Sequence, residues 1–169
     1  MTLIIAIAAL VPLVDYGWQL RGEIKNKMTA GSNQPPQRSE LAEPFEARFF
    51  VGHSGDTVRY RLMKPLNYDL KKKYPLVACL HHGGAHGSDN SIQIDGAGAA
   101  QFLSLYTNRI KYPAFIFVPQ CPKNLGWQDI DAPVFETIDW LETVFPVNTK
   151  KIYVTGKLWP EMYEIQFGQ

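Results

Sequence analysis

The hydrophobic pattern of the chain is dominated by short apolar runs that end in glycine or proline. Residues 76–80 and 114–118 are almost entirely apolar, and residues 151–156 form a third run that stops at a glycine. Runs of this length with such boundaries are typical of strands that are buried on both faces of a parallel sheet. We therefore predict three buried strands at these positions.

A different pattern precedes these runs and predicts an antiparallel hairpin. Residues 45–51 and 57–64 are rich in aromatic and β-branched side chains, and the separator 52–56 reads Gly-His-Ser-Gly-Asp, which is typical of a turn. In the second arm Val58 and Tyr60 alternate with polar residues. This alternation indicates a strand with one buried and one exposed face.

Two segments between the predicted strands have helical character. Residues 91–107 contain small residues followed by apolar positions at helical spacing, which predicts a helix packed closely on the sheet. Residues 133–144 repeat the helical spacing, with Asp131 and Pro133 as helix-entry signals. The whole order predicts an α/β fold in which an antiparallel hairpin is followed by three parallel strands with crossover helices. Right-handed crossovers place the loops after these strands at one edge of the sheet.

Composition narrows the class of protein without identifying a function. The chain has 169 residues and a net charge of +1, which suits one globular domain and does not favour binding to nucleic acid or to an anionic membrane. Two cysteines, Cys79 and Cys121, are too few for a disulfide framework or a zinc site. Cys79 lies within a predicted buried strand, so we expect it to be a small core residue.

The N-terminal part has its own composition. Residues 2–14 are almost unbroken in apolar character but too short to span a bilayer, so we expect no spanning helix and interpret residues 1–25 as a signal peptide or an N-terminal anchor. Met28 is an alternative start. Residues 26–44 are polar and proline-rich, as in a linker. The protein is expected to be exported, to the periplasm or outside the cell, if the apolar segment is a signal peptide, and otherwise cytoplasmic.

The loop after the first buried strand is rich in polar side chains and glycines. Its sequence from position 81 to 90 is His-His-Gly-Gly-Ala-His-Gly-Ser-Asp-Asn. Open α/β sheets place their chemistry in such loops, at the carboxyl ends of the strands. His82 and His86, with His81 and Asp89, have the side chains of a metal site, but ligands four residues apart require a helix, and two intervening glycines favour a loop. We therefore expect no metal and no cofactor.

Four landmarks stand in order along residues 45–156 and together have the pattern of a known family. They are Tyr-Arg-Leu at 60–62 followed by a proline, the loop 81–90, Val-Pro-Gln-Cys-Pro at 118–122 with Trp127, and Lys-Ile-Tyr-Val-Thr-Gly at 151–156. In this order they resemble the α/β-hydrolase superfamily, in its esterase, phospholipase/carboxylesterase and predicted-peptidase branch. The resemblance implies an N-terminal half of that fold and serine-dependent hydrolysis of a small ester.

The resemblance also implies roles for the histidine–glycine loop. Hydrolysis of an ester places negative charge on a carbonyl oxygen, which backbone N–H groups of this loop stabilise in the family. By resemblance Gly83 is an oxyanion-hole donor, and Gly84 supports the turn. His82 stands where a glycine is usual, and His82 and Trp127 are candidates for the substrate cleft.

The resemblance stops after Gly156. The family places its nucleophile in a Gly-x-Ser-x-Gly turn, whereas residues 156–160 read Gly-Lys-Leu-Trp-Pro, with Leu158 in place of serine. Residues 157–169 look unrelated to the family, and the expected downstream Asp and His are missing, so we assign no catalytic residue. This abrupt change is the pattern of a frameshift, a truncation or a fragment.

Two interpretations of the function follow. In the first, the chain is a truncated carboxylesterase-like hydrolase that is inactive as given. In the second, it is a non-catalytic remnant that acts as a binding or assembly module. Truncation would also leave the strand at 151–155 with an unpaired apolar edge, through which the chain could self-associate.

Overall fold

The structure of this chain is a computed structural model, and it describes residues 41–156. The predicted signal peptide or anchor at 1–25, the linker apart from residues 41–44, and the tail at 157–169 lie outside the described residues. None of the helices in the described part is both long enough and apolar enough to cross a bilayer.

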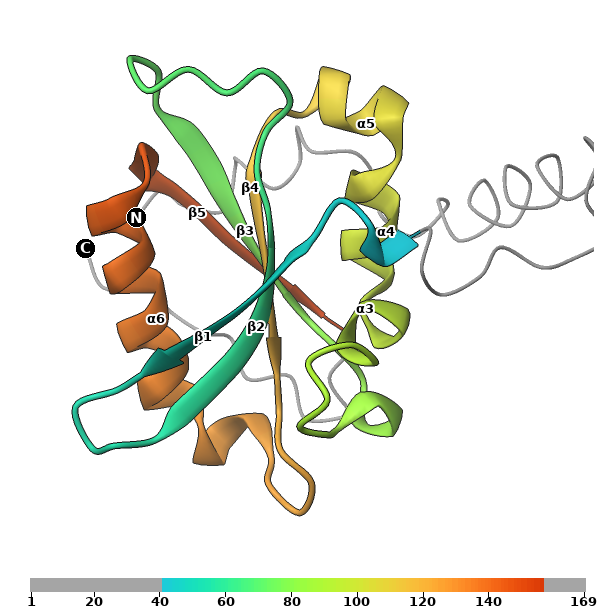
Figure 1. The fold of residues 1–169 in the computed structure, drawn as a ribbon, viewed down its shortest axis with the longest axis vertical. Coiled ribbons are helices and arrows are strands. Elements are labelled where there is room, and N and C mark those ends of the chain that lie inside the picture. The colour runs from blue at the N-terminus through green and yellow to red at the C-terminus, as the bar shows by residue number, and fades with distance from the viewer. Residues whose placement is uncertain (1–40, 157–169) are drawn as a thin grey trace, which may run out of the picture. The chain divides into compact units, whose positions relative to one another are not determined.

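A mixed sheet of five strands forms the centre of the described part (Figure 1). Its strand order is β1-β2-β4-β3-β5. The strands are β1 (Glu46–Val51), β2 (Thr57–Met63), β3 (Tyr74–Leu80), β4 (Phe115–Gln120) and β5 (Val147–Gly156). β1 and β2 pair antiparallel, and β3 pairs parallel with both β4 and β5. These pairings confirm the predicted α/β fold, with a hairpin followed by three parallel strands.

The carboxyl ends of the parallel strands lie at one edge of the sheet, together with the beginning of β2. β2 runs antiparallel to β4, so that Arg59 pairs with Gln120 near the end of β4. The loops after β3 and β4 therefore lie at the same edge, seen at the bottom of Figure 1. This is the edge at which the sequence predicts the functional loops.

Helices cover both faces of the sheet (Figure 1). On one face lies α6 (Asp131–Val144), and on the other lie α3 (Gln93–Gly96), α4 (Gly98–Ser104) and α5 (Tyr106–Lys111). Two short 3₁₀ helices, η1 (Gly83–Ala85) and η2 (Trp127–Asp129), stand in the loops after β3 and β4.

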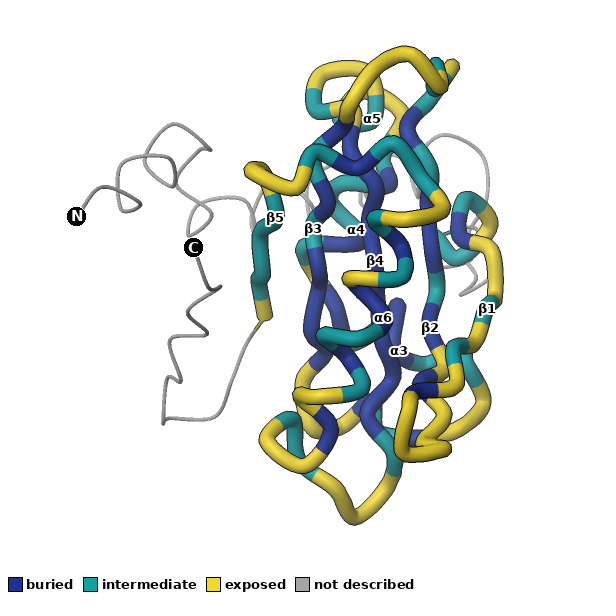
Figure 2. Tube along the Cα trace, turned by 90° about the vertical axis from the view of Figure 1, so that its left-hand side faces the viewer, coloured by how far each residue is buried: buried dark blue, intermediate teal, exposed yellow. Residues whose placement is uncertain are grey.

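Successive side chains of β4 point to opposite faces of the sheet, so the core has two parts, one on each face. Phe115 and Phe117 pack with the buried residues of α6, whereas Ile116 and Val118 pack with those of α3 and α4. All six residues of β4 are buried, and β3 is buried over most of its length, as Figure 2 shows. β5 is only half-buried from Ile152 to Thr155. Cys79 is buried in the core as predicted, and Cys121 is also buried; both are free thiols.

The prediction of one helix over residues 91–107 is wrong, because the segment is broken into three. Ala97 (φ −110°, ψ 79°) separates α3 from α4, and Leu105 (φ −59°, ψ 135°) separates α4 from α5. The first break has a packing cause. A Cβ on Gly96 would lie 2.5 Å from the Ala85 Cβ and 3.0 Å from the His81 Cβ, so the chain approaches the loop after β3 more closely than a helix with side chains could.

The limits of the predicted buried strands also change, and β3 begins at Tyr74 rather than at residue 76. β5 begins at Val147, four residues before the apolar run, and β4 continues through Pro119 to Gln120. Both extensions follow from pairing with neighbours, since Val147 pairs with Tyr74 and Pro119 pairs with Tyr60.

Candidate functional site

His81 is the buried centre of the loop that follows β3, with 1% of its surface exposed. The Cys121 N–H donates to its Nε2 at 2.9 Å, and the Nδ1 lies 2.8 Å from the His82 carbonyl oxygen. A backbone N–H can only donate, so Nε2 accepts and the ring proton is on Nδ1, which donates to His82. Burial lowers the pKa of His81, against the opposing effect of the His82 carbonyl. His81 is therefore a neutral structural residue that ties the loop to the end of β4.

Trp127 completes this attachment from η2. Its ring centroid lies 4.9 Å from that of His81, and its Nε1–H donates to the His81 carbonyl oxygen at 3.3 Å. The predicted cleft residue Trp127 thus packs against His81 and is half-buried. Through His81, the loop after β3, the exit of β4 and η2 form one connected unit.

The histidines of this loop are not arranged as metal ligands. Both ring nitrogens of His81 are used in hydrogen bonds, and the Nδ1 of His82 accepts the Gly84 N–H at 3.1 Å. The segment between His82 and His86 is a 3₁₀ turn rather than an α-helix. The described residues contain no group of three or more side chains placed to bind a metal ion.

Hydrogen bonds to the His82 carbonyl fix the backbone that leads into the Gly83–Gly84 turn. The His82 carbonyl oxygen accepts hydrogen bonds from the His81 ring and from the Ala85 N–H, the latter at 3.0 Å. The peptide between His82 and Gly83 is trans, so its N–H points opposite to its carbonyl and away from His81. The Gly83 N–H has no acceptor among the described residues.

A side chain at Gly83 would have open space around it. A Cβ placed on Gly83 would meet no heavy atom within 4 Å, whereas one on Gly84 would lie 3.0 Å from the His82 ring. Residues 82–84 are all exposed. The structure thus brings together an exposed Gly83 N–H without an acceptor among the described residues, a Gly84 N–H that donates to the His82 ring, and a His82 carbonyl held by two hydrogen bonds.

A polar network that sequence reasoning missed fixes the far end of the loop. Gln120 is buried, donates from Nε2 to Asp89 at 2.7 Å, and accepts the Asn90 N–H at 2.7 Å. Asp89 also accepts the N–H groups of Ser91 and Ile92. The Gln120 hydrogen bond is the largest cause of a lowered pKa at Asp89, so this carboxylate stays ionised and holds the loop on β4.

Cys121 lies beside His81, but it is not an activated nucleophile. The residue is fully buried, and its thiol lies 3.4 Å from the Leu125 carbonyl oxygen as a donor. Burial, with a smaller contribution from the negative charge of Asp129, raises the pKa of Cys121 to about 11. Only a thiolate is an effective nucleophile, so a Cys–His mechanism does not fit this pair.

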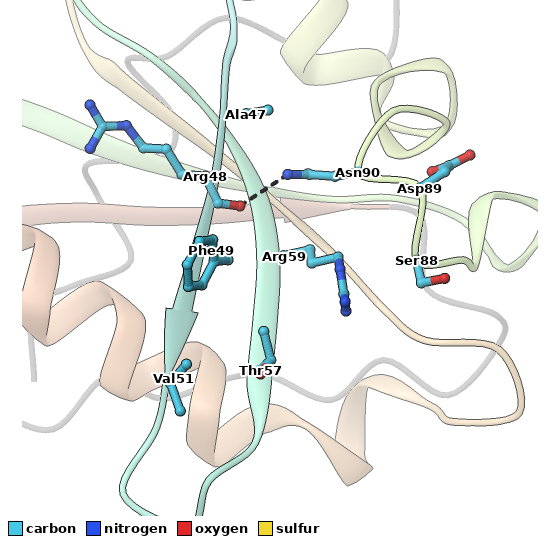
Figure 3. Close-up of a pocket in the computed structure, with 9 residues that line it drawn as sticks. All are labelled: Ala47, Arg48, Phe49, Val51, Thr57, Arg59, Ser88, Asp89 and Asn90. Carbon is cyan, nitrogen blue, oxygen red and sulfur yellow. Dashed lines mark hydrogen bonds between the residues drawn. The ribbon is translucent and has the colours of Figure 1, made fainter.

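A separate open hollow of about 530 Å³ lies next to the loop, on the outer face of the β1–β2 hairpin (Figure 3). Arg59 extends from β2 on the side of the hollow where Ser88 lies, and the Asn90 Nδ2 donates to the Arg48 carbonyl oxygen at 3.0 Å. Its lining residues are Ala47, Arg48, Phe49, Val51, Thr57, Arg59, Ser88, Asp89 and Asn90. The hollow borders the candidate site through residues 88–90 only.

The order of the strands and the position of the loops show that this chain has an α/β-hydrolase fold. Its candidate functional residues lie in the loops after β3 and β4. One solved structure with this fold bears out the esterase branch that the four landmarks resemble. A thermostable esterase matches 69% of this chain at 29% identity with a TM-score of 0.65. A CE1 ferulic acid esterase from Anaeromyces mucronatus matches 66% of the chain at 16% identity with a TM-score of 0.50 and supports the fold.

These matches cover only part of the other proteins. The chain spans 34% of the thermostable esterase and 48% of the ferulic acid esterase. No protein-family model and no curated protein matches the chain.

Proposed function

We propose that the described residues form the oxyanion-hole side of a carboxylesterase-like serine hydrolase. The observation that carries this proposal is the exposed Gly83 N–H, which has no acceptor among the described residues and whose peptide is held through the His82 carbonyl after β3. Attack on an ester produces a negatively charged oxygen, and a backbone donor fixed in position stabilises it. Gly84, Trp127 and His81 support the donor, and His82 borders the cleft for a small ester substrate.

The chain as given is proposed to be inactive by itself. Residues 156–160 read Gly-Lys-Leu-Trp-Pro and contain no serine, and Cys121 is a protonated, buried thiol. An oxyanion donor without a nucleophile and its base leaves only a small part of the rate enhancement of a hydrolase.

A fusion protein tests the proposed function. Residues 41–156 would be joined to the part of the thermostable esterase that follows the strand equivalent to β5. The family resemblance implies that this part carries the serine, the acid and the base. We expect the fusion to hydrolyse p-nitrophenyl acetate and the unfused chain to show no turnover. A folded but inactive fusion, or turnover by the unfused chain that survives removal of the Gly83 N–H, contradicts the proposal.

One observation favours the second interpretation, a non-catalytic assembly module. Among the described residues β5 pairs only with β3, and Ile152 and Val154 are half-buried on it. A strand edge of this kind pairs readily with another strand, here from a second copy of the chain. Sedimentation of the purified chain tests this proposal: a concentration-dependent dimer that Val154→Lys abolishes supports it, and a monomer at all concentrations contradicts it.

A further inference from the structure

The hollow beside residues 88–90 has an apolar wall that is exposed to solvent. Phe50 packs on Trp140 of α6, with ring centroids 5.8 Å apart, so its neighbours Phe49 and Val51 point to the opposite face of β1. Phe49 and Val51 line the hollow and keep 67% and 52% of their surface exposed. A ligand in the hollow would therefore remove apolar surface from water.

Arg59 lies beside this apolar wall. It pairs with Phe49 in the register of β1 and β2, which places the two side chains on one face of the hairpin with their Cβ atoms about 5 Å apart. Its guanidinium has no hydrogen bond, ion pair or ring contact among the described residues. Figure 3 shows this side chain extending into the space between β2 and Ser88. Its N–H donors are thus directed toward the hollow and not toward another part of the described chain.

The other charged residues of the hollow are engaged elsewhere. The Arg48 guanidinium is bound to Glu46 at 2.6 Å, and Figure 3 shows its side chain leaving the hollow. The Asp89 carboxylate accepts hydrogen bonds from Gln120 and from the backbone of the loop, and it points away from Arg59 (Figure 3). The lining residues thus present one unpaired positive charge, with one carboxylate at the border.

We propose that this hollow binds a small amphipathic monocarboxylate, with its carboxylate on Arg59 and its apolar part on Phe49 and Val51. A carboxylate matches the forked geometry of a guanidinium, and an apolar chain covers surface that is otherwise exposed. The negative charge of Asp89 disfavours a dianion such as a phosphate ester, which one guanidinium does not neutralise. The volume of about 530 Å³ is in the range of small-molecule sites.

The proposed carboxylate site is separate from the glycine turn. None of Gly83, Gly84 and Trp127 lines the hollow, which meets the loop after β3 through residues 88–90. Binding of a carboxylate in the hollow therefore requires no hydrolase activity. An inactive esterase fusion would contradict the proposed function and leave the carboxylate site standing.

Backbone NMR of the full ¹⁵N-labelled chain at pH 7.5 tests the proposal, with octanoate as the probe. Octanamide is its neutral equivalent, and acetate has the carboxylate without the apolar chain. Octanoate should shift the amides of Thr57, Arg59 and Ser88 in a saturable way, with a Kd roughly ten-fold lower than that of either control compound. The amides of β5, at the other edge of the sheet, should not shift.

Two substitutions test the charge and the apolar wall separately. Arg59→Gln should raise the octanoate Kd roughly ten-fold, because it removes the charged partner of the carboxylate. Its control is Lys72→Gln, which removes an exposed charge in the loop before β3. Phe49→Thr keeps a strand-forming residue and should raise the Kd roughly three- to ten-fold. Its control is Leu70→Thr, at another exposed apolar residue of that loop.

Three results would overturn the proposal. They are the absence of saturable shifts at the hollow, an equal Kd for octanoate and octanamide, and an equal Kd in each variant and its control. Amides of residues 47–51 that shift with protein concentration but not with octanoate would also contradict it, because they would assign the apolar wall to contact with a second copy of the chain.

Discussion

Gly96 occupies a position where no side chain fits. A Cβ there would lie 2.5 Å from the Ala85 Cβ, and the His82 N–H also donates to the Gly96 carbonyl. We expect Gly96→Ala to lower the free energy of unfolding by about 1–3 kcal/mol, as overpacking of a close contact does. Urea unfolding followed by circular dichroism measures this loss.

Gly98 supplies the matched control for this prediction. It is the first residue of α4, and an added Cβ would meet nothing within 4 Å. Gly98→Ala should leave stability unchanged or raise it by up to about 1 kcal/mol. Equal losses in the two variants would contradict the close packing of Gly96 against the loop after β3.

Both thiols should resist modification in the folded protein. Cys79 and Cys121 are buried, and burial raises the pKa of each thiol, to about 11 for Cys121. At pH 8 we therefore expect no reaction with Ellman's reagent in buffer and two equivalents of reaction in guanidinium chloride. Rapid reaction of one thiol in buffer would contradict its burial in the folded protein. The variants Cys79→Ala and Cys121→Ala would identify which thiol reacts.

Individual residues differed in how far the sequence could predict them. Burial of Cys79 followed from the apolar run around it. The role of Gly83 and Gly84 came from the family resemblance and stays a prediction. The role of His81 was not predictable, because it depends on a contact with Cys121, forty residues away. Gln120 gave one usable signal, a polar residue at the end of a buried strand, which implies a buried hydrogen-bond partner.

At the scale of elements, we expect the hydrogen bonds through which His81 joins the end of β3 to the end of β4 to make stability dependent on pH. Burial lowers its pKa in the folded state, so the unfolded chain binds a proton more readily than the folded one. Its contribution to stability is therefore complete above the ordinary imidazole pKa of 6.5 and declines as the pH falls below that value. We expect the urea midpoint of the wild type to decrease between pH 7.5 and pH 5.

His81→Gln separates this effect from those of the carboxylates. A glutamine amide can accept from Cys121 and donate to His82, but it does not titrate in this range. Its urea midpoint should be lower than that of the wild type at pH 7.5 and should fall less on acidification. An equal acid-induced decrease in both proteins would contradict the assignment of His81 as a buried neutral group.

Secondary structure was predictable where periodicity and local turn chemistry agree. The hairpin and α6 follow from the alternation along β2 and from the spacing of apolar residues after Pro133. The breaks at Ala97 and Leu105 could not be predicted, because small residues in a helical pattern do not reveal how closely the chain approaches another loop. Glycines at 96 and 98 were the available signal.

For the whole molecule, the order of strands and helices was sufficient to predict the α/β class, and four landmarks in sequence indicated the esterase branch. The order β1-β2-β4-β3-β5 then brings the end of β3 beside the end of β4, which places His81 against Cys121 and Trp127 near the glycine turn. The turn that carries the Gly83 amide is thereby joined to the buried centre of the sheet.

The central claim, that the Gly83 amide is an oxyanion donor, can be tested without disturbing the turn. Gly83 is the first residue of a 3₁₀ helix with open space around its Cβ position, and the preceding His82 is extended, so proline fits there. Gly83→Pro removes the N–H and Gly83→Ala retains it.

The decisive measurement is kcat/KM of the esterase fusion for p-nitrophenyl acetate with each of these two substitutions. We predict that Gly83→Pro lowers the value by about 10²–10³, the usual effect of losing one oxyanion-hole donor, and that Gly83→Ala leaves it close to that of the unsubstituted fusion. Equal values for the proline and alanine variants would contradict the assignment of the Gly83 N–H as the donor.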